Sequence, residues 1–181
     1  MAEPAASWKE IQIRRGAAAI FPEVLDQARA LRANADLPDD VLARVVPAIS
    51  GWAPSGHLEH LAVAGRSTLP LMEMALSAPA PVGVLNASGH KLFALGAFPR
   101  GQAQAPEFSR PRGVPFGKLR SSLDRYLEGL ANLSSRLAEI EKAPGTAVHP
   151  LLGSLTALEW LLFLKLHQEH HLRIIAEILA G

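Results

Sequence analysis

Leucines recur every three or four residues along residues 115–142, and this helical spacing constrains the fold of the chain more than any other feature. The stripe consists of Leu119, Leu123, Leu127, Leu130, Leu133 and Leu137. An amphipathic helix with such a stripe has to bury its apolar face against a partner. The sequence therefore predicts a helix from about Pro115 to Lys142, which packs against other helices and ends before Pro144-Gly145.

Three further segments have helical periodicity, and no segment favours a strand. We expect them to run from about Pro22 to Leu31, from about Ala53 to Ser77, and from near Ser154 to the C-terminus. Pro54 suits a first helical turn, whereas Pro70 removes a backbone donor and predicts a kink. The pattern Thr156-x-x-Glu159 resembles a capping box. Four long helices predict an all-α four-helix bundle, formed by residues 1–181 as a single domain.

A long crossover should join the second and third helices, because residues 78–114 are rich in proline and glycine. We expect one short helix within it, from Gly89 to Gly96, and another short helix from Asp36 to Val46. Loops of this length in compact domains are often functional. Arg100, Arg110, Arg112 and Lys118 form a mildly basic stretch in and just after this segment, which we interpret as a solvated loop.

Composition argues against several classes of partner. A formal net charge of +1 offers no electrostatic footprint for nucleic acid or an anionic membrane. The longest apolar run, Leu161 to Leu164, is too short to span a membrane, and the N-terminus lacks the apolar run of a secretory signal. We therefore expect a cytoplasmic protein. Because there is no cysteine, only His, Asp or Glu can hold a metal, and a thiol nucleophile has to be a bound small molecule.

The last predicted helix contains three of the seven histidines in a span of five residues, at His167, His170 and His171. Side chains three or four residues apart share a helix face, so imidazoles at this spacing can hold one metal ion. At about 100° per residue, His167 and His171 fall within the apolar stripe and His170 lies at its edge. We expect His90 and His149 to lie in loops, with His149 helping to start the last helix.

Two known metal motifs do not match this cluster. A zinc protease needs His-Glu-x-x-His, whereas here Glu169 stands one place too late to serve as the general base. A di-iron carboxylate bundle needs Glu-x-x-His on two helices, and no acidic residue stands three places before a histidine. A solvated helix end whose histidines bind nothing remains an alternative.

A third ligand has two candidates at the start of the second helix, His57 and His60. Both are expected to face inward, so periodicity does not choose between them. Carboxylates often orient ligating imidazoles, and Glu59, Glu169 and Asp124 are available for this role.

Three groups of residues form a recognisable set. They are Trp52-x-Pro54 followed by His60-Leu61; Phe98-Pro99-Arg100-Gly101-x-x-x-Ala105-Pro106-Glu107; and His149-Pro150-x-x-Gly153-x-Leu155-Thr156-x-x-Glu159-Trp160 leading to His167-x-x-His170-His171. Together, over roughly residues 50–176, they resemble the DinB/YfiT-like metal-dependent four-helix bundles, and within them a bacterial subgroup described as a domain of unknown function.

The resemblance implies a divalent metal, usually zinc or nickel, held by one histidine of the second helix and a His-x-x-x-His pair of the fourth. On this chain the ligands would be His60, His167 and His171, with His57 as an additional histidine. Family members of known activity resemble thiol S-transferases and isomerases that use low-molecular-weight thiols such as bacillithiol or mycothiol. The resemblance and the 49% hydrophobic content also predict a homodimer.

Three imidazoles at about 2.0–2.1 Å leave one position of a tetrahedral zinc open, as in catalytic sites. A water or thiol at that position loses its proton readily. We therefore expect a metal-dependent transferase or hydrolase of small substrates. The alternative is a noncatalytic metal-binding or stress-related bundle in which the metal is structural. An open cavity beside the ligands would favour the enzyme, and a closed four-ligand site would favour the structural role.

Overall fold

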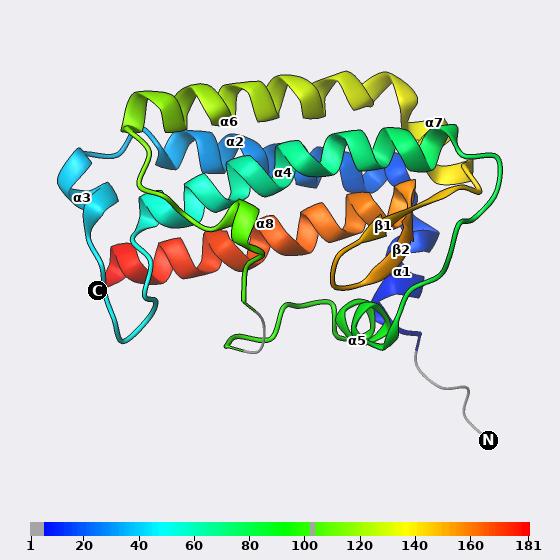
Figure 1. Ribbon diagram of the computed structural model, residues 1–181, viewed down its shortest axis with the longest axis horizontal. Coiled ribbons are helices and arrows are strands. Elements are labelled where there is room, and N and C mark those ends of the chain that lie inside the picture. Colours follow the sequence, from blue (N-terminus) through cyan, green and yellow to red (C-terminus); the bar gives the residue numbers. More distant parts are fainter. Residues whose placement is uncertain (1–5, 102–103) are drawn as a thin grey trace.

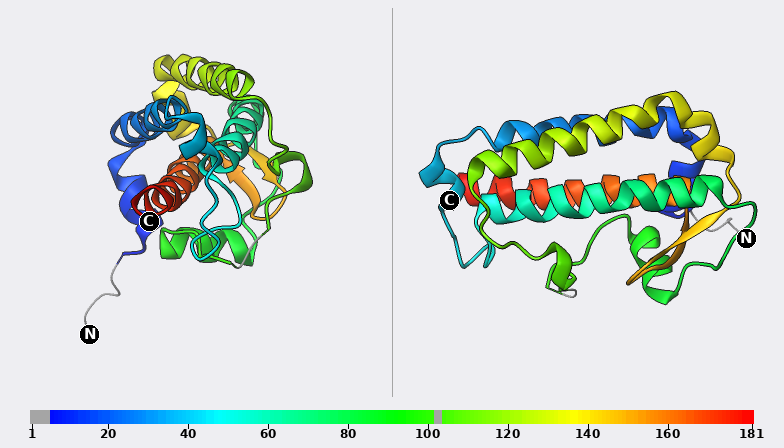
Figure 2. Two further views of the ribbon diagram at one scale, coloured as in Figure 1. Left: turned by 90° about the vertical axis from the view of Figure 1, so that its left-hand side faces the viewer. Right: turned by 45° about the horizontal axis from the view of Figure 1, so that its top comes forward.

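Four long helices dominate the computed structural model, which describes residues 6–101 and 104–181 (Figure 1). The helices are α2 (Ala17–Asn34), α4 (Pro54–Ser77), α6 (Phe116–Ala131) and α8 (Ala157–Ala180). Viewed along their length, they surround a common interior (Figure 2). The predicted all-α four-helix bundle, with a long crossover between α4 and α6, is confirmed.

The helix α8 lies opposite α6 in the bundle (Figure 2). It contacts both α2 and α4, and α6 covers α2 and α4 from the opposite side. Trp160 and Leu161 of α8 are almost fully buried, as are Leu123 and Leu130 of α6. Since α4 and α8 run in opposite directions, the first turns of α4 lie beside the C-terminal half of α8 (Figure 1).

The N-terminal part of the chain is more helical than its sequence predicts. A short helix, α1 (Trp8–Arg15), begins with a capping box in which Ser7 and Glu10 bond to each other's backbone amides. The helix α2 begins before Pro22 and extends past Leu31, so the predicted bounds are too narrow. A proline in the second turn removes only one backbone hydrogen bond, and burial of the apolar face compensates for it. The helix α4 likewise continues through Pro70.

The third predicted helix is divided. Its first part, α6, ends at Ala131, a 3₁₀ segment η2 (Asn132–Arg136) follows, and α7 (Leu137–Lys142) completes it. Asn and Ser residues compete for backbone hydrogen bonds and therefore weaken an α-helix. The leucine stripe continues through the break, which is why periodicity alone predicts one helix.

A β-hairpin precedes α8, so the expectation of no strand is wrong. It pairs β1 (Thr146–His149) with β2 (Gly153–Thr156) in antiparallel register, with His149 opposite Gly153. Strands of four residues are too short for an alternating pattern to stand out. The helix α8 consequently begins at Ala157, where Thr156 and Glu159 form the predicted capping box.

The placement of two histidines in loops is also wrong. His149 is the last residue of β1, and His90 lies on α5 (Ala87–Leu95), the helix predicted as Gly89–Gly96. The crossover also contains a 3₁₀ turn, η1 (Glu107–Ser109), while the connection between α2 and α4 contains α3 (Asp39–Ala43), which is shorter than predicted. No helix in the described part of the chain is both long and apolar enough to cross a membrane.

The close approach of α4 to α6 depends on Gly65. A methyl group at this position would lie 2.6 Å from the Tyr126 ring, whereas a methyl group at Gly117 on α6 would meet nothing within 4 Å. We expect Gly65→Ala to lower the free energy of unfolding by about 1–3 kcal/mol through overpacking. The control Gly117→Ala should change it by less than about 1 kcal/mol, and in the stabilising direction. Urea denaturation measures both, and equal effects of the two substitutions would refute this account.

Candidate metal centre

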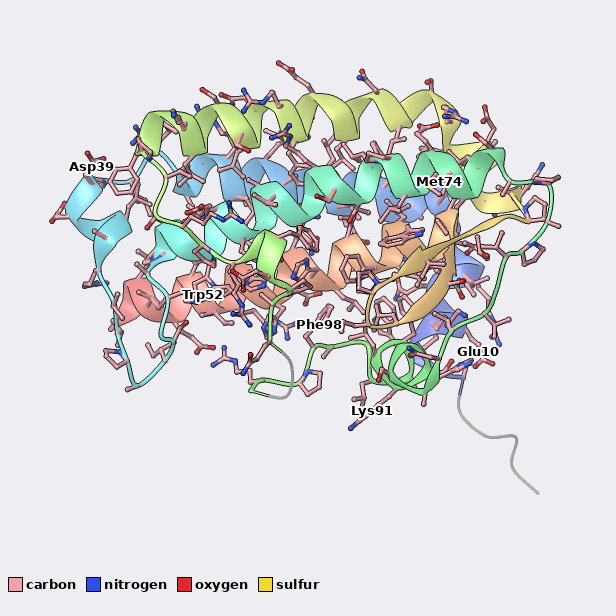
Figure 3. All side chains as sticks on the ribbon, in the orientation of Figure 1. Glu10, Asp39, Trp52, Met74, Lys91 and Phe98 are labelled. Atoms are coloured by element: carbon pink, nitrogen blue, oxygen red, sulfur yellow. The ribbon has the colours of Figure 1, made fainter. Side chains whose placement is uncertain are left out.

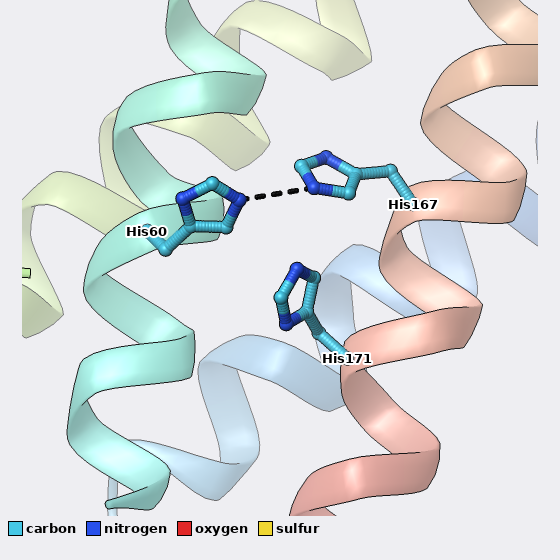
Figure 4. A group of neighbouring side chains, drawn as sticks. All are labelled: His60, His167 and His171. Atoms are coloured by element: carbon cyan, nitrogen blue, oxygen red, sulfur yellow. Dashed lines mark hydrogen bonds between the residues drawn. The ribbon is translucent and has the colours of Figure 1, made fainter. Parts of the chain in front are cut away.

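Three buried histidines from two helices meet inside the bundle (Figure 4). His60 projects from the second turn of α4, and His167 and His171 project from α8, one turn apart. Their exposed fractions are 4%, 9% and 7%, respectively. One ring nitrogen from each lies within 4.8 Å of the others. The three residues predicted from the sequence are therefore brought together, and we call them the histidine triad.

The spacing of the triad suits a divalent cation. The Nε2 atoms of His60 and His167 are 3.0 Å apart (Figure 4). Two nitrogen ligands of a tetrahedral zinc, each at about 2.0–2.1 Å from the metal, are about 3.3–3.4 Å apart. A small rotation of either ring brings this pair to that separation, so the residues present fit a metal ion.

The crossover sets the tautomer of His60. The Nδ1 atom of His60 donates to the backbone carbonyl of Ser109, at 2.8 Å. Ser109 ends the turn η1 and is itself buried. With the proton on Nδ1, the lone pair of Nε2 is directed toward His167. A backbone carbonyl thus does for His60 what carboxylates commonly do for ligating histidines.

The three carboxylates that the sequence offers for orienting the imidazoles bond to other groups. Glu59 accepts hydrogen bonds from three successive backbone amides of the crossover, at residues 112–114, with distances of 2.9, 3.0 and 3.3 Å. Glu169 and Asp124 form ion pairs with arginines. Within the described residues, none of the three bonds to an imidazole. Glu59 nevertheless helps to place Ser109, because it ties the same segment of crossover to α4.

Two further histidines border the triad without belonging to it. His57 is 3% exposed, with its Nδ1 atom 2.9 Å from Nδ1 of His171 and its Nε2 atom 2.9 Å from Ser50 Oγ. His170 is half-buried, and its ring centroid lies 5.0 Å from that of His171. Between the two candidates that periodicity leaves open on α4, the geometry therefore favours His60.

Burial holds these imidazoles in their neutral form. Loss of hydration lowers the pKa of His57 to about 4, with a smaller contribution from neighbouring histidines. Burial and then the neighbouring imidazoles place the pKa of His167 and of His171 well below the ordinary value of 6.5. The pKa of His60 is also lowered by burial, against a smaller opposing effect of its bond to Ser109. Because only neutral imidazole binds a metal, the triad has the charge state that ligation requires near pH 7.

A cavity of about 600 Å³ opens beside the triad. This volume is within the range of small-molecule sites, about 300–1,000 Å³. Its apolar walls include Trp52, Leu71, Phe98, Phe108, Leu151, Trp160, Phe163 and Ile174. Trp52 and Phe98 lie on the side of the bundle that faces the crossover (Figure 3). The Trp52 indole is nearly parallel to the His171 ring, at 7°, and the Phe98 ring lies 5.4 Å from that of His167.

His149 is a polar group of this cavity, whereas from the sequence we expect it only to help start the last helix. Its Nδ1 accepts the Leu151 amide at 3.1 Å, which leaves the ring proton on Nε2. Burial lowers the pKa of His149 to about 4, so the ring is a neutral N–H donor at pH 7. Its centroid lies 4.7 Å from that of Phe163, whose ring in turn stacks against His167. A sequence signal for the hairpin would have been needed to place His149 in this cavity.

Buried neutral histidines predict that the protein, prepared without metal, loses stability on acidification. The unfolded chain takes up protons near pH 6.5, whereas folded His57 and His149 stay neutral to about pH 4. Since the unfolded state then binds more protons, the free energy of unfolding falls as pH drops through this window. Between about pH 6.5 and pH 4, the thermal unfolding temperature should depend less steeply on pH in His149→Phe than in the wild type. Identical slopes would contradict burial of a neutral His149.

Comparison with known families agrees with the fold. A family model described as the DinB superfamily matches residues 24–175, which include the four bundle helices except for the outer ends of α2 and α8. Comparison with curated proteins and with solved structures gives no match. Since the matched region covers most of the sequence, the chain belongs to the DinB superfamily.

Proposed function

We propose that the chain binds one divalent metal ion, zinc or nickel, through His60, His167 and His171, and that it is a metal-dependent transferase or hydrolase of small apolar substrates. The observation that carries this proposal is the position of three neutral, converging imidazoles at the wall of a 600 Å³ cavity. A bound metal would supply a Lewis acid that lowers the pKa of a water or thiol next to it.

The residues of the chain contribute binding and orientation. The aromatic walls formed by Trp52, Phe98 and Phe163 exclude water and favour a substrate with an apolar body. His149 offers a neutral N–H group to an acceptor atom of that substrate. Because the chain has no cysteine, any thiol that is transferred has to enter as a low-molecular-weight cosubstrate. A thiol S-transferase, which the family resemblance implies, is the specific activity that we place first.

A noncatalytic bundle with a structural metal is the alternative. The low exposure of the triad favours it, since structural sites are enclosed. Two observations weigh against it: the cavity beside the triad, and the lack of a fourth ligand in the group formed by the described residues. Measurements of metal content and of thiol binding separate the two functions.

Replacement of each triad histidine by Ala should abolish metal binding, because two imidazoles hold a divalent ion far more weakly than three. Elemental analysis of protein purified without a histidine tag should find one metal ion per wild-type chain and almost none in the three variants. The control His170→Ala, adjacent to the site but outside the triad, should keep its metal. If His60→Ala still contains one metal ion per chain, His60 is not a ligand.

Small thiols should bind to the metal-loaded protein with an affinity that rises with pH, because binding as the thiolate releases a proton. Calorimetric titration with several low-molecular-weight thiols measures this, and binding should vanish in His171→Ala. The enzyme proposal fails if no thiol binds and if electrophiles and esters react no faster than with His171→Ala. The structural alternative would then stand.

A further inference from the structure

A chain of hydrogen bonds leads away from the triad to the turn that precedes α4. The Nδ1 atom of His171 lies 2.9 Å from Nδ1 of His57, and the Nε2 atom of His57 lies 2.9 Å from Ser50 Oγ. Ser50 Oγ also accepts the backbone amide of Trp52, at 3.0 Å. Both nitrogens of His57 are thus engaged, and neither of them belongs to the triad.

The protons along this chain can be ordered in a way that suits a metal site. A neutral imidazole has one N–H donor and one acceptor nitrogen. If His171 presents the lone pair of Nε2 to the triad, its Nδ1–H donates to Nδ1 of His57. The proton of His57 is then on Nε2, where it donates to the free lone pair of Ser50 Oγ. Each imidazole N–H of the chain then meets an acceptor.

The opposite order would disable the triad. If Nδ1 of His57 carried the proton and donated to His171, the proton of His171 would have to be on Nε2. That nitrogen would then have no lone pair for a cation, and His60 and His167 would be left as a pair. Whether His171 can ligate therefore depends on the direction of the hydrogen bond that it shares with His57.

We infer that His57 is a positioning residue: it accepts the Nδ1–H of His171, and it holds the Nε2 lone pair of that ring toward His60 and His167. Ser50 completes the arrangement, because its Oγ accepts a hydrogen bond from Nε2–H of His57. The inference rests on the proposed metal site. It assigns His57, the extra histidine of α4, a role that is neither ligation nor simple packing.

The arrangement also connects the site to the wall of the cavity. Trp52 shares Ser50 Oγ through its backbone amide, while its indole ring lies parallel to His171, with centroids 6.3 Å apart. The turn of residues 50–52 is thus connected to His171 in two ways. Ser50 reaches it through hydrogen bonds to His57, and the Trp52 ring stacks on it. A change in His57 should alter the geometry at the metal without removing a ligand.

Two substitutions of His57 separate positioning from ligation. The side-chain oxygen of Asn occupies the place of imidazole Nδ1, so His57→Asn keeps the acceptor for His171 but provides a poor zinc ligand. His57→Leu removes the acceptor. Ser50→Ala removes the end of the chain and leaves every imidazole in place. His170→Leu is the matched control, because His170 also adjoins His171 but shares no hydrogen bond with it among the described residues.

Zinc affinity is measured by competition with a chromophoric chelator, and the coordination of Co²⁺ is followed by its visible spectrum. We expect His57→Leu to weaken zinc binding about 10–100-fold, as loss of an outer hydrogen-bond partner does at other metal sites. His57→Asn should restore most of the affinity, with a wild-type Co²⁺ spectrum. Ser50→Ala should show a smaller loss than His57→Leu, and His170→Leu should match the wild type.

Three results would overturn the inference. Equal losses in His57→Asn and His57→Leu, with Ser50→Ala unchanged, would make His57 a ligand. Wild-type affinity in all four variants would mean that packing alone orients His171. A wild-type protein that binds no metal would reject the proposed function itself, and with it the role of His57. Circular dichroism of each variant shows whether a loss arises from unfolding instead, and Ser50→Ala then provides the test on a folded chain.

Discussion

The antiparallel packing of α4 against α8 is the interaction on which the rest of the structure depends. It brings His60 beside His167, 107 residues later in the chain, along helix faces whose buried side chains are mostly apolar. The same apolar contacts that stabilise the bundle therefore place the triad. Because helix positions are rigid relative to loops, imidazoles on two packed helices keep their spacing with little loss of side-chain freedom.

Burial of the triad has an energetic consequence that a metal ion offsets. Removing the three triad imidazoles from water favours their neutral form, and each added positive charge among them would be repelled by the others. Among the three imidazoles, one hydrogen bond joins Nε2 of His60 to Nε2 of His167. A divalent ion at the centre of the triad would contact a nitrogen of all three at once, so binding should also stabilise the fold.

The sequence predicts the bundle well because its long helices carry strong periodic signals. The same stripes contain His167 and His171, whereas the choice of His60 over His57 rests on the family resemblance. The sequence does not predict the hairpin, the break after Ala131 or the helix α1, whose local signals are short. The hydrogen bonds of His60 and His57 are equally hidden, since they depend on the path of the crossover and of the turn before α4. The homodimer stays a prediction.

The crossover has a larger part in the site than its loop character suggests. Glu59 holds its backbone against α4, and this attachment positions the Ser109 carbonyl that sets the tautomer of His60. Phe98, from the same segment, covers His167. A bundle of the four helices alone would contain the same three histidines, but nothing would direct the lone pair of His60 or close the cavity beside it. The helices thus determine where the imidazoles lie, and the connections between helices determine how their protons are arranged.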